Sequence, residues 1–192
     1  MKVDGWKVDE WKVDEWKMDG WKVDGWKVDV LQPTSLPVRP FSLPLHFNTK
    51  IMTIPEIENE IQSEFLMFED WMDKYNYLIE LGKNLPLIDE QYKTDQFIIT
   101  GCQSKVWLHA AYRDGIVFFT ADSDAIITKG IVSLLIRVLS GHSPDSIIQA
   151  DLAFIDQIGL REHLSPTRSN GLSSMIKQMK LYATVFKMKM GT

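Results

Sequence analysis

The spacing of apolar residues changes twice along the second part of the chain, from helical to alternating and back to helical. The first helical stretch carries apolar side chains every three or four positions, at Ile54, Ile57, Ile61 and Phe65. Residues with this spacing share one face of an α-helix. The preceding Thr53-Ile-Pro-Glu56 has the spacing of a capping box, with proline in the first turn, where its missing N–H does no harm. We therefore predict an amphipathic helix that begins after Thr53.

A second amphipathic helix is predicted from the spacing of Trp71, Tyr75, Leu78 and Ile79. We expect it to end at Gly82, with Pro86 beyond, because glycine and proline are common at helix ends. The period then changes. Residues 104–112 and 116–121 are apolar runs separated by Arg113-Asp114-Gly115, and Asp-Gly between such runs predicts a β-hairpin.

The rest of the chain is helical in its spacing. The sequence ADSDAIITKGIVSLLIRVLSG (121–141) predicts a buried helix that ends at Gly141. Ser143-Pro144-Asp145 opens a short helix, and DLAFIDQIG (151–159) predicts another. A last helix is predicted after HLSPTRSNGL (163–172), with one face made of Leu172, Met175, Ile176, Met179, Ala183 and Phe186. Helices, a hairpin and further helices indicate an α+β class, a small antiparallel sheet with helices packed on it.

The first part of the chain has a different character. Residues 1–30 are six units of five residues, WKVDE and close variants, and a period of five matches neither a helix face nor a strand face. Residues 31–51 carry four of the eight prolines and no acidic residue. We interpret 1–51 as a disordered, non-globular segment and 52–192 as one domain. Such a short tandem repeat is typical of translated repetitive DNA, and we hypothesise that the native protein begins at Met52.

Charge and composition exclude several classes of function. The net charge is −5, and residues 52–192 hold 13 basic and 18 acidic side chains without a basic run, a poor match to nucleic acid. The apolar stretches are far shorter than the ~20 residues of a membrane span, and no signal peptide is visible. A single cysteine forms no internal disulfide, which fits a reducing cytosol, so a cytoplasmic location is expected.

The single cysteine, Cys102, lies in TDQFIITGCQSKVWLHAAYRDG (94–115), between two apolar runs that we predict to be strands. Gly101 permits unusual backbone angles, and Gln103 and Ser104 are polar, so a turn is predicted here rather than a buried structural cysteine. A metal or iron–sulfur site is disfavoured, because cluster ligation normally needs four protein ligands. The histidines of the domain also lack ligand spacing and are predicted to be surface or hairpin residues: His109, His142 and His163.

Two chemical roles for Cys102 stay open on the residues alone. It can be the nucleophile of a hydrolase or transferase with a histidine base, although no local motif of a cysteine hydrolase surrounds it. Alternatively, a lone thiolate can accept a sulfane sulfur from another protein and later surrender it. This thiol-exchange chemistry needs an accessible thiolate and no second cysteine.

Four motifs resemble the SufE/CsdE family of sulfur-acceptor proteins, and they occur in the expected order: GCQSKVWL (101–108), DSDAIITKGIVSLLI (122–136), SGHSPDSI (140–147) and HLSPTRSNGLSSMI (163–176). KYNYLIELGKNLP (74–86) is similar to the family's early helix. The resemblance covers essentially all of 52–192 and none of 1–51. It implies an α+β fold like that of the IscU scaffold, and a sulfur carrier that needs no cofactor or metal and is not an enzyme on its own.

The resemblance also implies partners and site residues. Cys102 is the implied persulfide acceptor. The implied donor is a SufS- or CsdA-type cysteine desulfurase, a pyridoxal-phosphate enzyme that the carrier stimulates, and the implied recipient is a SufBCD-type scaffold for iron–sulfur assembly. Supporting or partner-binding roles are expected for Gly101, Gln103, Ser104, Asp122, Ser123, Asp124 and Arg168.

The supporting residues have simple interpretations as well. Asp122-Ser123-Asp124 is predicted to cap the following helix, or alternatively to lie beside the cysteine turn and restrain it, or to present a polar group to the desulfurase. Gln103 and Ser104 are expected to fix the turn, and Asn170-Gly171 to form another. Arg168 is hypothesised to brace the cysteine loop or to stabilise thiolate and persulfide by charge. Because an exposed thiolate oxidises, we predict that Cys102 rests against an apolar surface and swings out when the desulfurase docks.

Overall fold

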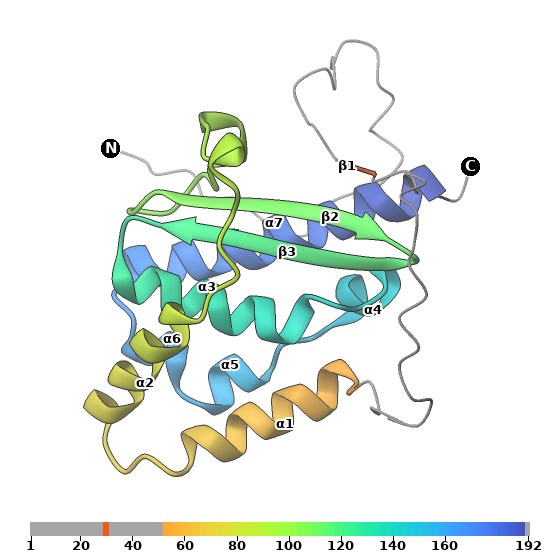
Figure 1. Ribbon diagram of the computed structural model, residues 1–192. Coiled ribbons are helices and arrows are strands. Elements are labelled where there is room, and N and C mark those ends of the chain that lie inside the picture. Colours follow the sequence, from red (N-terminus) through yellow and green to blue (C-terminus); the bar gives the residue numbers. More distant parts are fainter. Residues whose placement is uncertain (1–28, 31–51, 191–192) are drawn as a thin grey trace, which may run out of the picture.

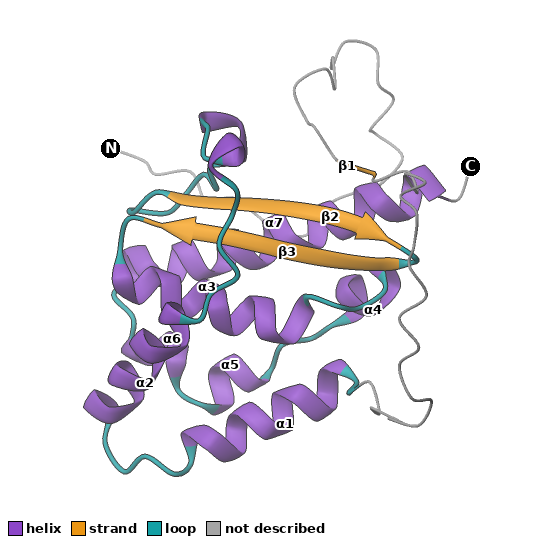
Figure 2. Ribbon diagram, in the orientation of Figure 1, coloured by secondary structure: helices purple, strands orange, loops and turns teal. Residues whose placement is uncertain are grey.

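The structure, a computed structural model, describes residues 29–30 and 52–190 (Figures 1 and 2). The sheet has the order β1-β2-β3, in which β1 (Asp29–Val30) pairs in parallel with Ala111 and Tyr112 of β2 (Val106–Arg113). Apart from β1, the segment 1–51 lies outside the described residues, so its interpretation as non-globular and the start at Met52 stay predictions.

The predicted hairpin is confirmed. β2 pairs antiparallel with β3 (Ile116–Ser123) over the full length of both strands, from Arg113 opposite Ile116 to Val106 opposite Ser123. The two-residue turn between them has positive φ at both positions, 52° at Asp114 and 84° at Gly115. Asp-Gly accepts this conformation with little strain, which is why this dipeptide sets the register of the hairpin.

The outer edge of β3 is bonded along its whole length by other parts of the chain. The N–H groups that point away from β2 donate to the carbonyl of His142 (from Val117, 2.9 Å), to Oγ of Ser140 (from Phe119, 3.0 Å) and to the carbonyl of Pro86 (from Ala121, 3.1 Å). The sheet therefore presents no row of unpaired groups on this side.

Three helices pack together on one side of the hairpin. α3 (Ile126–Leu139) packs along β3, and α1 (Ile54–Phe65) and α2 (Trp71–Lys83) pack on α3 (Figure 1). The predicted start of α1 is confirmed, with the Glu56 carboxylate accepting the backbone N–H of Thr53 at 2.8 Å.

The sequence predicted that α2 ends at Gly82. In the structure, Gly82 lies inside the last turn of this helix. A Cβ on Gly82 would lie 2.8 Å from the backbone nitrogen of Gly130 in α3, and one on Gly130 would lie 2.1 Å from the carbonyl oxygen of Leu78. These two glycines let the backbones of α2 and α3 touch. Gly82 therefore serves the contact between two helices and not the end of one.

The C-terminal part consists of α4 (Pro144–Gln149), α5 (Phe154–Gln157), α6 (Leu160–His163) and α7 (Pro166–Met190). The predicted short helix after Ser143 is confirmed, and its N-cap hydroxyl accepts the N–H of Ser146. The long helix α7 runs behind the sheet (Figure 1). It begins earlier than predicted, so Asn170-Gly171 lies within a helix and not in a turn. Its predicted apolar face is buried in the core, except that Ile176 is partly exposed: Leu172, Met175, Met179, Ala183 and Phe186.

The fold is thus an α+β arrangement, as the sequence predicted. In the described residues, no helix combines the length and the continuous apolar character that a membrane crossing requires. α2 is joined to β2 by a connection that holds two short 3₁₀-helices, η3 (Glu90–Tyr92) and η4 (Asp95–Phe97). This connection leads directly into the residues around the single cysteine.

Candidate functional site

Cys102 lies in a loop whose two ends are joined to each other. The N–H of Ile99 donates to the carbonyl of Val106 at 2.8 Å, and Ile98 pairs with Trp107 in an isolated antiparallel bridge. The run before the cysteine is therefore a 3₁₀-helix and one bridge, not the strand that its β-branched residues predicted. The predicted placement of Cys102 on a loop holds nevertheless, because the bridge at its base closes residues 100–105 into a compact turn.

Gly101 is required by both backbone conformation and space. Its φ of 90° lies in a region that residues with a side chain rarely adopt. A Cβ at this position would also lie 2.6 Å from Oγ of Ser174 in α7. Gly101 therefore lets the loop lie directly on α7 and sets the direction in which the next residue, Cys102, points.

The thiol of Cys102 rests against α7. Its S–H donates to the carbonyl oxygen of Gly171, with Sγ 3.6 Å from that oxygen. Gly171 has no side chain, and a Cβ there would lie 3.4 Å from Sγ. The cysteine therefore packs directly against the backbone of α7. Cys102 is half-buried and packs against the hydrophobic core.

Burial raises the pKa of the Cys102 thiol, because an apolar surrounding disfavours the charged thiolate. The resting cysteine is therefore a protonated thiol at neutral pH, which is a poor nucleophile and a poor target for oxidants. This half-buried position agrees with the predicted shielding of Cys102 against an apolar surface. The predicted outward swing of Cys102 requires a second conformation of the loop, with the desulfurase docked, and stays a prediction.

Gln103, the residue after the cysteine, connects the loop to the start of α7. Oγ1 of Thr167 donates to the side-chain oxygen of Gln103 at 3.2 Å, and Oγ of Ser165 lies 3.2 Å from the same hydroxyl. The sequence predicted that Gln103 would fix its own turn, whereas its side chain contacts another element. Ser104 is half-buried at the next position.

Ser123 and Asp124 bond to Lys105, the last residue of the loop. Oγ of Ser123 donates to the carbonyl of Lys105 at 2.8 Å, and the backbone N–H of Asp124 donates to the same carbonyl at 3.3 Å. The Asp124 carboxylate in turn accepts the N–H of Lys105 at 3.0 Å. All backbone polar groups of Lys105 are therefore bonded to these two residues, so this side of the loop is fixed.

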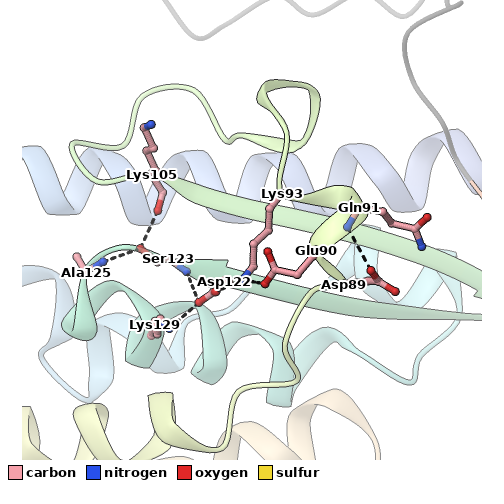
Figure 3. A network of polar contacts seen from close by, with 9 residues as sticks. All are labelled: Asp89, Glu90, Gln91, Lys93, Lys105, Asp122, Ser123, Ala125 and Lys129. Atoms are coloured by element: carbon pink, nitrogen blue, oxygen red, sulfur yellow. Dashed lines mark hydrogen bonds and ion pairs between the residues drawn. The ribbon is translucent and has the colours of Figure 1, made fainter.

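Asp122 lies at the end of β3 and is bonded to two lysines (Figure 3). Its carboxylate lies 2.6 Å from Nζ of Lys129 in α3 and 2.9 Å from Nζ of Lys93, and it accepts the N–H of Ser123 at 2.8 Å. Burial alone would raise the pKa of Asp122, but the hydrogen bonds from Lys129, Lys93 and Ser123 outweigh it and lower the pKa. Asp122 is therefore a carboxylate at neutral pH.

The simpler prediction for these three residues, a helix cap, is wrong. Asp122 and Ser123 belong to β3, and the N-cap of α3 is Ala125, whose side chain makes no capping bond. Ser123 comes nearest to that role, because its hydroxyl accepts the N–H of Ala125 at 3.3 Å. The contacts match the alternative prediction, in which the tripeptide lies beside the cysteine loop and restrains it.

Arg168 lies in the first turn of α7 with an exposed side chain. Among the described residues, none makes a hydrogen bond or an ion pair with it, so no bracing of the loop by Arg168 is seen. The preceding residue, Thr167, makes the contact with Gln103. A role in stabilising a thiolate or persulfide by charge stays a prediction.

The histidines lie in three different environments. His109 lies in the hairpin, one of the two places predicted for it, where it is buried in β2 and stacks on Tyr92 with ring centroids 3.9 Å apart. His163 is exposed and stacks on Trp71 at 3.9 Å. Burial lowers the pKa of His142. Within the described residues, the thiol of Cys102 bonds to a carbonyl and not to any of these rings. No group of three or more metal-binding side chains gathers there either.

Sequence reasoning missed Lys93, Gly171 and Ser174. The sequence predicts a turn at Gly171, which lies in the same motif as Arg168, and Ser174 follows in that motif. The signal was available in the combination of small residues within a helical apolar pattern, because small residues mark places where another backbone approaches closely. Lys93 lies outside all the motifs and left no such signal.

Comparisons with known proteins agree on one family. The family model described as "SufE: Fe-S metabolism associated domain" matches residues 59–183. An uncharacterized SufE-like protein of Rhizobium meliloti (strain 1021) is 41% identical over 127 residues, covering 64% of this chain and 91% of that protein. "SufE-like protein 1, chloroplastic/mitochondrial" of Arabidopsis thaliana is 36% identical over 140 residues, covering 72% of this chain and 38% of that protein.

A solved structure supports the fold. The solution structure of a hypothetical protein from Thermus thermophilus superposes with a TM-score of 0.58, at 21% sequence identity, and covers 69% of this chain and 96% of the other. The α+β arrangement described above is therefore shared with that protein.

Proposed function

Because the chain belongs to the SufE family, whose domain is associated with Fe–S metabolism, we propose that Cys102 is a persulfide acceptor in sulfur transfer. The donor is a SufS- or CsdA-type cysteine desulfurase, which the protein stimulates by removing its product, and the recipient is a SufBCD-type scaffold. The protein carries sulfur and has no turnover of its own. The cytoplasm is our proposed location, although the Arabidopsis relative is named chloroplastic/mitochondrial.

The observation that carries this proposal is the resting position of Cys102. The thiol is half-buried beside Gly171, its pKa is raised by burial, and its loop is fixed at the base by Ile99, Val106 and Lys105. A cysteine that has to react with other proteins, but not with solvent oxidants, needs such a shielded rest state and a way to leave it.

The transfer step is a thiol exchange. On docking, the tip of the loop leaves α7 and enters the polar site of the partner, where Cys102 loses its proton to a base of that site. The Cys102 thiolate then attacks the outer sulfur of the desulfurase persulfide. A bond forms between this sulfur and Sγ, the old sulfur–sulfur bond breaks, and its electron pair leaves with the desulfurase cysteine as a thiolate. No net oxidation occurs, because the same sulfane sulfur changes its partner.

The test uses the full chain, a SufS-type desulfurase, pyridoxal phosphate and L-cysteine, with peptide mass spectrometry as the readout. We expect one added sulfur atom on the Cys102 peptide, its removal by reductant, and its absence in Cys102→Ser. If Cys102 stays bare beside a desulfurase that carries its own persulfide, and a second desulfurase gives the same result, the proposal is wrong.

The runner-up from another class is a cysteine-dependent hydrolase or transferase. The same preparation separates the two, because a hydrolase turns over model esters or amides alone, whereas a carrier does nothing to them without its desulfurase. The protonated thiol and its bond to a carbonyl oxygen favour the carrier, since a hydrolase activates its cysteine with a base within hydrogen-bond reach.

A further inference from the structure

The segment before the cysteine loop and the segment after it both bond to Asp122-Ser123-Asp124. Lys105, on the leaving side, is bonded to Ser123 and Asp124. On the entering side, Lys93 forms an ion pair with Asp122. Figure 3 shows the contacts of Lys105 with Ser123 and of Lys93 with Asp122, side by side at the end of β3. We call residues 89–99, with η3 and η4, the arm, and residues 100–104 the tip.

The arm lies on the sheet through three kinds of contact. Its last residues bond to β2 through the backbone, with the N–H of Ile99 donating to the carbonyl of Val106 at 2.8 Å. Its aromatic residues pack on β2, where Tyr92 stacks on His109 at 3.9 Å and Phe97 meets the same ring edge-on at 5.7 Å. Its charged contact is the pair between Lys93 and Asp122, at 2.9 Å. The Asp122 side chain is 12% exposed and that of Lys93 23%, and the same carboxylate also binds Lys129 at 2.6 Å.

The tip is held much more weakly than the arm. Within the described part of the chain, two side-chain hydrogen bonds join residues 100–104 to α7, namely the thiol of Cys102 to Gly171 (3.6 Å) and Thr167 to Gln103 (3.2 Å). Both are between neutral groups, and a thiol is a weak donor. Bonds that involve charged groups are roughly twice as strong as neutral ones. Any small movement of the loop will therefore break the contacts of the tip first.

We propose that Lys93 is a positioning residue for Cys102. Its bond to Asp122 holds the arm on the sheet, so that docking moves the tip and leaves the entrance of the loop in place. Only the tip then moves, so Cys102 can reach a small range of positions. If the arm were free, Cys102 would move with it over a much wider range. Without Lys93, the thiol reaches the sulfur of a docked partner less often, although the docking surface is unchanged. The first readout below is independent of the proposed function, and the second rests on it.

The first readout is hydrogen–deuterium exchange of the full chain. Lys93→Met should accelerate exchange in peptides that hold the amides of Tyr92 and Phe97 by about three- to tenfold, while peptides of α7 stay unchanged. Lys93→Arg should restore slow exchange. Glu90→Gln is the matched control, because it removes the other ion pair of Lys93 inside the arm and keeps the pair with Asp122. Equal exchange in Lys93→Met and the unsubstituted chain, or equal acceleration in Glu90→Gln, overturns the proposal.

The second readout is single-turnover sulfur transfer from a SufS-type desulfurase that carries its persulfide. With Lys93→Met, the rate at saturating desulfurase should fall several-fold, and the half-saturating concentration should stay the same. A changed half-saturating concentration with an unchanged saturating rate makes Lys93 a docking residue and overturns the proposal. If even the unsubstituted chain accepts no sulfur, the proposed function fails, and the exchange experiment still decides whether Lys93 fixes the arm.

Discussion

The sulfur atom of Cys102 lies 3.6 Å from the carbonyl oxygen of Gly171, a residue 69 positions further along the chain. The contact exists because α7 presents a residue without a side chain at this point. A Cβ on Gly171 would lie 3.4 Å from Sγ, 3.7 Å from Cα and 3.8 Å from Cβ of Cys102, which is ordinary contact for a methyl group and leaves no space for more. The resting state of the cysteine is thus set by the size of one residue on another element.

Gly171→Leu should displace Cys102 from its resting position. The longer side chain overlaps the thiol, so the tip moves outward and the reaction of Cys102 with a bulky disulfide reagent becomes several-fold faster. Gly171→Ala is the control, because its methyl group fits. If Gly171→Leu and Gly171→Ala react at the same rate, the thiol is not held by this contact.

Gly130→Ala and Gly171→Ala should have opposite effects on stability, although both change a helical glycine to alanine. Alanine favours a helix over glycine by about 1 kcal/mol, and Gly171→Ala should gain some of this. At Gly130 the new Cβ would lie 2.1 Å from the carbonyl oxygen of Leu78, so α2 and α3 must separate, at a cost of about 1–3 kcal/mol. Urea unfolding of the two variants measures both changes. A gain in stability for Gly130→Ala would contradict the close contact of these helices.

The raised pKa of Cys102 predicts how alkylation depends on pH. In the folded protein, the rate of alkylation by iodoacetamide should reach half its maximum at a higher pH than in the urea-unfolded chain. The same shift stabilises the fold below the pKa of the unfolded thiol, and this contribution disappears as the pH rises through the folded pKa. Cys102→Ala should therefore lose less stability between pH 7 and alkaline pH than the unsubstituted protein. Identical alkylation profiles in the folded and unfolded states would exclude the shielding.

Glu64 should make the fold sensitive to acid. Its carboxylate binds Arg137 of α3 through two hydrogen bonds of 2.6 and 2.7 Å and accepts one from Tyr77 of α2 at 2.7 Å. The bond from Arg137 is the main cause that lowers the pKa of Glu64. This lowered pKa stabilises the fold above the unfolded pKa of glutamate, and the contribution is lost as the pH falls through the folded value.

Glu64→Gln should lower stability at pH 7, by about 1–2 kcal/mol, and flatten its decline in acid. Glu60→Gln is the matched control. It removes the weaker partner of Arg137, at 3.1 Å, and keeps the two-bond pair with Glu64. Urea unfolding from pH 3 to 7 measures how steeply the free energy of unfolding declines in acid for the unsubstituted chain and the two variants. A decline in Glu64→Gln as steep as that in the unsubstituted chain would assign the acid sensitivity to other carboxylates.

The sequence predicted those parts of the fold that are set locally. The capping box at Thr53, the Asp114-Gly115 turn and the N-cap at Ser143 each depend on a few neighbouring residues, and each is found as predicted. The apolar face of α7 is set by spacing alone, so it was also predicted. The class followed from the order of these elements.

The parts that the sequence did not predict depend on contacts between distant residues. Gly82 and Gly171 carry the usual signals of helix ends and turns, but each serves a neighbour that only the tertiary structure supplies. Asp122 carries the signal of a helix cap, and its two lysines come from separate elements. For the candidate site, the sequence predicted that Cys102 lies on a turn, whereas the contact of its thiol with α7 required knowing which elements meet.

The bonded outer edge of β3 limits how any other protein can recognise this one. An open edge accepts a strand from almost any chain, because main-chain groups are the same in every sequence. Here Val117, Phe119 and Ala121 already donate to the protein's own groups, so that general mode of association is closed on this side. It is closed equally to a second copy, which removes one route to fibrous aggregation. A partner that binds on this side has to recognise side chains, so its binding can be altered one substitution at a time.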